Sequence, residues 1–125
     1  MCIRDRSKNI NLVYSINEPS GVGAAEALEA AGVKATIVSV DGGCDPGITS
    51  VKSGVIGATS QQYPLDMAKL GVEAIAKKVR DNVDPKVTPG LDFYDTGVKL
   101  VTDKPVDGVE SIDTTAADKI CWGKK

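Results

Sequence analysis

The sequence contains no histidine, and aromatic residues make up only 4% of its 125 residues. Without an imidazole, no serine or cysteine nucleophile has its usual base, and no GxSxG motif is present. The three cysteines show no CxxC spacing, so four zinc ligands cannot be assembled and we expect no metal site. These absences argue against an enzyme, and we expect neither catalysis nor a cofactor.

Long apolar runs and clusters of basic residues are also missing. No apolar run approaches the roughly 20 residues of a membrane span, so we expect no membrane insertion. Lys and Arg do not gather among aromatic residues, so nucleic acid is not an expected partner. The remaining composition, 42% hydrophobic and 26% charged residues without internal repeats, is ordinary for a globular protein.

The first residues, MCIRDR, have neither helical nor strand periodicity and are too short and too charged for a secretion signal. Their reverse translation, ATG TGT ATA AGA GAC AGx, matches a transposon end that is used to prepare sequencing libraries. We therefore expect residues 1–6 to be a sequencing-adapter artefact and the native message to begin near Ser7. Without Arg4, Asp5 and Arg6 the formal charge is one unit more negative than the value of -2 for the whole chain.

Hydrophobic periodicity predicts strands that alternate with helices. The predicted strands are 9–16, 34–40, 55–61 and 96–102, and the predicted helices are 19–31, 47–53 and 64–81. Gly32 lies where a helix commonly ends, and a turn-rich linker, DNVDPKVTPG, follows the last helix. Strand, helix, strand, helix, strand with short links predicts parallel strands and right-handed crossovers. The fold class is therefore α/β, a parallel sheet with flanking helices.

Polar side chains follow three of the predicted strands: Asn17, Asp41 and Gln62. In open α/β sheets, ligands bind outside the carboxyl ends of the strands, so we expect these side chains to converge on one crevice. A carboxylate accepts hydroxyl protons, and amides both donate and accept, which matches the hydroxyl groups of a sugar. The alternative is that Asn17 or Asp41 is only a turn former or a helix cap.

A rival interpretation is nucleotide binding, because Gly21 and Gly23 follow a strand and Asp41 lies downstream at the spacing of a dinucleotide fingerprint. Glu26 occupies the place of the third glycine, however, and the four residues before Gly21 make the turn too long for a pyrophosphate. The pair Gly42 and Gly43 is better explained by turn geometry than by a phosphate cradle.

The cysteines allow two interpretations once Cys2 is set aside with the first six residues. The remaining pair, Cys44 and Cys121, is even in number and far apart in sequence, which suits a disulfide. The alternative is two buried free thiols, because cysteine is often simply a small core residue.

Several segments carry a resemblance to a known family. The segments are NINLVYSINEPSGVGAAEALEAAG, IVSVDGG, GVIGATSQQYPLDMAKLGVEAI, and the tail TGVKLVTDKPVDGVESIDT with CWG. They resemble the C-terminal part of sugar-binding proteins of ABC transporters, in the ribose/fructose-type periplasmic family with the periplasmic binding protein-like I fold. The tail most resembles fructose-type members. The resemblance implies that Asn17, Asp41 and Gln62 contact the sugar.

The same resemblance implies the organisation and the setting of the protein. Residues 7–63 would be part of the second sugar-binding lobe, 64–95 a helix and linker that return to the first lobe, and 96–125 a hinge-crossing strand and tail. The first lobe, with its aromatic residues that stack on the sugar, is absent, which fits the low aromatic content. We expect a periplasmic monomer that binds a monosaccharide and delivers it to a membrane permease, and the oxidising periplasm favours the Cys44 to Cys121 disulfide.

Two other classes of protein stay open. The same fold serves as the effector domain of sugar-responsive transcription repressors, which would lack a disulfide and carry a DNA-binding helix pair upstream. A dinucleotide-binding enzyme fragment, with Asp41 as a base, has no accompanying catalytic group. The pocket contacts that distinguish pentoses from hexoses lie mostly outside this chain.

Overall fold

The computed structural model describes residues 9–123, which form two compact units. The first unit runs up to Gln61 and resumes at Lys99, and the second is Gln62–Val98. The expected artefact at residues 1–6 lies outside the described residues. None of the helices in the described part of the chain is long and apolar enough to cross a membrane.

The first unit is built on a sheet in the order β1-β2-β3-β4. Its strands are β1 (Leu12–Tyr14), β2 (Thr36–Asp41), β3 (Ala58–Gln61) and β4 (Lys99–Val101). The first three are parallel, as predicted, whereas β4 pairs with β3 in the antiparallel direction. The register explains the reversal: the chain leaves the sheet at Gln61 and re-enters it at Lys99, directly opposite. β1, β3 and β4 lie inside the predicted segments and are shorter, whereas β2 begins two residues later than predicted and ends one residue later, at Asp41.

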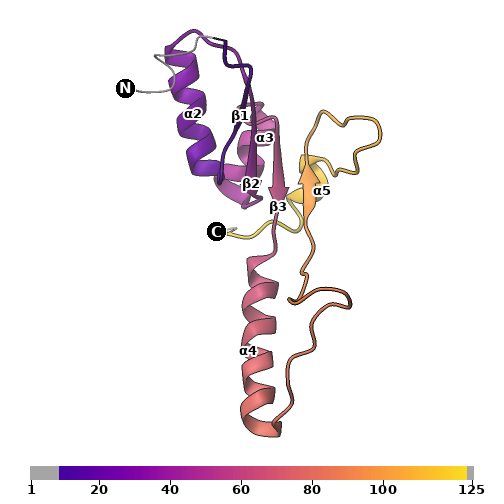
Figure 1. Cartoon of the computed structure of the whole chain (residues 1–125). Coiled ribbons are helices and arrows are strands. Elements are labelled where there is room, and N and C mark those ends of the chain that lie inside the picture. Colours follow the sequence, from indigo (N-terminus) through magenta and orange to yellow (C-terminus); the bar gives the residue numbers. More distant parts are fainter. Residues whose placement is uncertain (1–8, 124–125) are drawn as a thin grey trace. The chain divides into compact units, whose positions relative to one another are not determined.

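Helix α2 (Glu18–Ala30) connects β1 to β2 and packs beside them (Figure 1). Asn17 caps its N-terminus, because Asn17 Oδ1 accepts a hydrogen bond of 2.9 Å from the backbone N–H of Ser20. The helix ends before Gly32, whose φ of +65° few other residues adopt readily. Gly21 brings the helix close to the sheet, since a Cβ at this position would lie 2.8 Å from Ser15 Oγ.

Two apolar clusters form the core of the first unit. One contains residues of α2, β2, α3 and the loop before β3: Leu28, Ile37, Val51 and Ile56. The other joins the segment after β2 to β4 and to the tail: Ile48, Val101 and Ala117. The two faces of the sheet differ, because the register partners Ser39 and Thr59 are buried whereas Val38 and Ala58, on the opposite face, are only half-buried.

Three short helical segments complete the first unit: η1 (Cys44–Ile48), α3 (Thr49–Ser53) and α5 (Thr114–Ala117). The first two cover the predicted helix 47–53 and begin a few residues earlier. Helix α5 lies in the tail for which no element was predicted, since four residues are too few for a helical period. It is capped by Asp113, whose Oδ1 accepts a hydrogen bond of 2.7 Å from Ala116 N–H.

The second unit consists of helix α4 (Pro64–Asp81) and the irregular segment that follows it. The helix has the predicted bounds and ends at Asn82, which has a positive φ of 52°. No residue of Gln62–Val98 is buried. Several apolar side chains of α4 are largely exposed, namely Leu65, Val72, Ile75 and Val79. The helix therefore shows an apolar surface for which this unit provides no buried core.

Candidate ligand-binding site at the carboxyl ends of the strands

Asp41 is the last residue of β2 and has an unusual backbone conformation. Its φ is +119°, a region that residues other than glycine rarely adopt and that costs on the order of 1 to 3 kcal/mol. Such a conformation persists only where the surroundings hold it. Its register partner is Gln61, the last residue of β3. The contacts of the turn after Asp41 therefore decide how this side chain is presented.

The turn that follows Asp41 is held from two sides at Gly42. The backbone N–H of Gly42 donates a hydrogen bond of 2.5 Å to Glu18 Oε1, and its carbonyl accepts one of 3.0 Å from Gln61 Nε2. Gly42 has a φ of +70°, and a Cβ at this position would lie 2.4 Å from the Cα of Gln61. Only glycine fits here, so Gly42 serves turn geometry, as predicted, whereas Gly43 has an ordinary φ of -65°.

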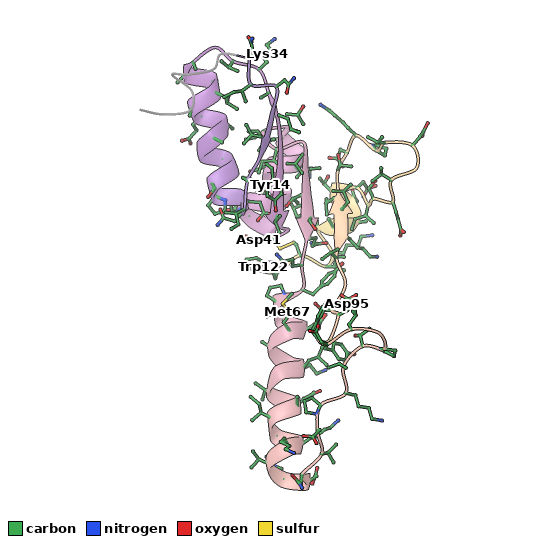
Figure 2. All side chains as sticks on the ribbon, viewed as in Figure 1. Tyr14, Lys34, Asp41, Met67, Asp95 and Trp122 are labelled. Carbon is green, nitrogen blue, oxygen red and sulfur yellow. A yellow bond between two sulfur atoms is a disulfide. The ribbon has the colours of Figure 1, made fainter. Side chains whose placement is uncertain are left out.

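The C-terminal tail holds the same turn through Trp122 (Figure 2). Trp122 Nε1 donates a hydrogen bond of 3.3 Å to the carbonyl of Asp41, and the Trp122 carbonyl accepts one of 2.9 Å from Cys44 N–H. Cys44 and Cys121 form a disulfide, as predicted for this pair, and are therefore not two free thiols. The tail is thereby joined covalently to the residue that ends the turn.

Glu18 is a buried carboxylate, only 2% exposed, at the first position of α2. Besides Gly42, it accepts a hydrogen bond of 2.6 Å from Thr59 Oγ1. Burial raises the pKa of Glu18, and the charge of Asp41 adds to that increase. The hydrogen bonds from Thr59, Gly42 and Gly43 act in the opposite direction. Desolvation is the largest of these effects, so the carboxyl holds its proton more tightly than an exposed glutamate.

The Asp41 carboxyl is half-buried, and partial burial raises its pKa as well. It lies at the carboxyl end of a central strand, where open α/β sheets bind their ligands. When ionised, a carboxylate at this position can accept hydrogen bonds from two hydroxyl groups.

Asn17 follows the end of β1 and is half-buried. Its Oδ1 serves as the cap of α2, as the helix-cap interpretation of Asn17 has it. A hydrogen bond from Asn17 to a ligand would have to come from Nδ2. Because β1 and β2 are adjacent parallel strands, Asn17 and Asp41 both belong to the same edge of the sheet.

Gln62 is the first residue of the second unit and follows Gln61 directly. It is half-buried, whereas Gln61 is fully buried and belongs to β3. The first unit therefore contains two of the three predicted residues, Asn17 and Asp41, and Gln62 continues the chain from the register partner of Asp41.

Sequence reasoning did not identify the residues that hold Asp41, namely Glu18, Gln61 and Trp122. Glu18 reads in the sequence as an ordinary acidic residue in the first turn of a helix. Gln61 comes directly before Gln62, and only Gln62 was predicted as the strand-end residue. Trp122 lies 81 residues from its partner, Asp41. A polar residue directly after a predicted site residue is the one local signal that could have drawn attention to Glu18.

The geometry weighs against a dinucleotide site. The Glu18 carboxylate occupies the start of α2, where a pyrophosphate would have to bind, and like charges repel there. Gly21 is needed for packing against Ser15 and Ser39, while a Cβ on Gly23 would meet nothing within 4 Å. Among residues 9–123, no group of His, Cys, Asp or Glu is arranged to hold a metal ion.

Comparison with known proteins gives the class of fold first. A solved structure of a galactofuranose-binding protein matches 74% of this chain with a TM-score of 0.62 and 28% sequence identity, over 30% of its own length. The chain thus has a periplasmic binding protein-like fold, and the predicted fold class is confirmed.

A sequence relative points to the same class of protein. The ribose import binding protein RbsB of Haemophilus influenzae (strain ATCC 51907 / DSM 11121 / KW20 / Rd) is 34% identical over 84 residues, which are 66% of this chain and 28% of that protein. No protein-family model matches the sequence. The predicted resemblance to part of a periplasmic sugar-binding protein is confirmed, and the chain spans less than a third of the length of either relative.

Proposed function

We propose that this chain is part of the substrate-binding component of a sugar ABC transporter, which binds a ribose-like or fructose-like monosaccharide. The observation that carries the proposal is the Asp41 carboxylate, presented at the carboxyl end of β2 by a turn that Glu18, Gln61 and Trp122 hold. Because the backbone at Asp41 is already held, sugar binding has to order only the side chain. The two relatives are named for sugar binding, which supports the same ligand class.

In this proposal Asp41 accepts two hydroxyl protons, and Asn17 and Gln62 supply amide contacts on either side. Asn17 donates through Nδ2, while its Oδ1 accepts the hydrogen bond that caps the helix. Gln62 is included because it directly follows Gln61, the register partner of Asp41.

The complete protein would be a two-lobed monomer in the periplasm that delivers its sugar to a membrane permease. Residues 7–63 would belong to the second lobe, 64–95 would return to the first lobe, and 96–125 would cross back. The division of the described chain at Gln62 and Lys99 supports these boundaries. The disulfide supports an oxidising compartment and counts against an intracellular repressor domain.

Calorimetric titration tests the proposal on the complete protein that carries this chain. The probes are ribose, fructose and galactofuranose, added to the wild type, to Asp41→Asn, and to Asp107→Asn as the control. Asp107 is an exposed carboxylate of the first unit, so it matches the charge change away from the sheet edge. We expect binding of at least one sugar, weakened in Asp41→Asn and unchanged in Asp107→Asn. Absence of binding to all three sugars, or equal affinity of wild type and Asp41→Asn, would contradict the proposal.

A further inference from the structure

Glu18 is a buried acid whose role the proposed contacts with sugar do not explain. With 2% of its surface exposed, it has almost no access to a ligand. Within the described residues no Lys or Arg forms an ion pair with it, and its hydrogen-bond donors are neutral. A buried carboxylate without a cation is costly, so its position calls for a specific reason.

That reason lies in the peptide group between Asp41 and Gly42, which is held at both ends. Its carbonyl oxygen accepts a hydrogen bond from Trp122 Nε1, and its N–H donates to Glu18 Oε1. With both ends fixed, this peptide plane cannot rotate about the adjacent bonds. Together with the peptide group before Asp41, which β2 holds in the sheet, it fixes the backbone on both sides of the Asp41 Cα and so the direction in which the side chain leaves it.

We propose that Glu18 is a positioning residue for sugar binding: by holding the Gly42 N–H, it fixes the strained backbone of Asp41 and aims the Asp41 carboxylate at the ligand. The inference rests on the proposed function for the ligand itself. Glu18, on α2, acts through the backbone N–H of Gly42, which lies in the turn after β2 and 24 residues further along the chain. Glu18 does not touch the sugar.

The hydrogen bond that Thr59 donates holds the Glu18 carboxyl next to the turn. Thr59 is fully buried on β3, and its hydroxyl donates to the same oxygen, Oε1, that accepts from Gly42. One oxygen therefore joins β3 to the turn after β2. A side chain of similar size without an acceptor would fill the space and leave both donors unpaired, so packing can be separated from hydrogen bonding by substitution.

The test compares Glu18→Leu and Glu18→Gln with Glu29→Gln in the complete protein. Leucine fills the volume without an acceptor, and glutamine keeps a neutral acceptor. Glu29 is exposed on the same helix and provides the matched control for loss of charge. Two signals are recorded: the dissociation constant for whichever of ribose, fructose and galactofuranose binds best, and the NMR shift of the Gly42 amide proton without sugar. Thermal melting identifies variants that do not fold.

We expect Glu18→Leu to bind sugar roughly tenfold more weakly, the loss that removal of a hydrogen bond to a charged group brings, and Glu18→Gln to fall in between. The Gly42 amide proton should move upfield in both variants and stay in place in Glu29→Gln. If Glu18→Leu does not fold, Glu18→Gln decides by the same two signals.

Two results would overturn the positioning role. One is a folded Glu18 variant with wild-type affinity, and the other is a Gly42 amide proton that keeps its shift in the folded variants. If the wild type binds none of the sugars, the proposed function fails. The amide signal then still shows whether Glu18 fixes the turn, so the two failures are distinguishable.

Discussion

Trp122 donates a hydrogen bond of 3.3 Å from Nε1 to the backbone carbonyl of Asp41, across 81 residues of sequence. The same tryptophan lies against Gly43, where a Cβ would come within 3.3 Å of its ring. The CWG tail therefore holds the turn that presents Asp41, the candidate sugar-binding residue. The turn and the tail are also joined by the disulfide between Cys44 and Cys121.

Breaking this disulfide should lower the free energy of unfolding. The bond closes a loop of 77 residues, and the chain-entropy model gives roughly 4 kcal/mol for such a loop, as an upper value. Denaturant unfolding of the complete protein with and without reductant measures the loss. In the variant with both Cys44→Ser and Cys121→Ser, reductant should have no effect. Two alkylatable thiols in the untreated protein, found by mass spectrometry, would contradict the bond.

Asp41 should contribute more to sugar affinity than either amide. Loss of two charge-assisted hydrogen bonds in Asp41→Ala should weaken binding roughly a hundredfold, whereas Asn17→Ala or Gln62→Ala loses about 1 kcal/mol per bond, near fivefold. Asp41→Asn should also weaken binding, because its NH₂ offers protons where the sugar already donates. Asparagine tolerates a positive φ better than alanine, so this variant separates charge from backbone strain. Equal losses in all variants by calorimetry would refute the ranking.

The strands and the longer helices could be predicted because their signals are local. Helix α4 has the predicted bounds, since Pro64 begins it and its apolar residues repeat at helical spacing. The direction of β4 could not be predicted in this way. It depends on the chain re-entering the sheet beside Gln61 after a separate unit, and no property of the segment 96–102 records that path.

The candidate site was predictable only in its strand-end residues. Asn17 and Asp41 follow predicted strands, so topology alone places them at one edge. Glu18 and Thr59 meet across 41 residues, and the backbone at Asp41 is held by contacts from α2, β3 and the tail together. Such contacts exist only once the sheet has formed, so local sequence patterns cannot predict them.

The 125-residue chain, expressed by itself, should be marginally stable and bind sugar weakly or not at all. No residue of Gln62–Val98 is buried, and apolar residues of α4 such as Val72 and Ile75 are exposed, so this part gains little from apolar burial. In the proposed two-lobed protein, half of the sugar cleft is also missing from the chain. Thermal melting and calorimetry with the same three sugars would check this. A cooperative melt together with micromolar affinity would contradict the expectation.

The fold should become less stable as pH rises through the pKa of Glu18. Burial raises this pKa above its ordinary value of 4.5, so the folded state binds the proton more tightly than the unfolded chain. The resulting stabilisation is complete below pH 4.5 and is lost as pH rises through the pKa of the folded state. Asp41 acts in the same direction from its ordinary value of 3.8, so it must be present in both proteins compared.

Glu18→Gln isolates this effect, because glutamine does not titrate and all other groups are shared. The advantage of the wild type over Glu18→Gln in the free energy of unfolding should be largest at acidic pH and shrink toward neutral pH. Urea unfolding of both complete proteins from about pH 4 to about pH 8 provides the measurement. Glu29→Gln, an exposed position on the same helix, should show no such trend. If the advantage of the wild type grew with pH instead, Glu18 would have a lowered pKa, and its hydrogen bonds from Gly42 and Thr59 would outweigh its burial.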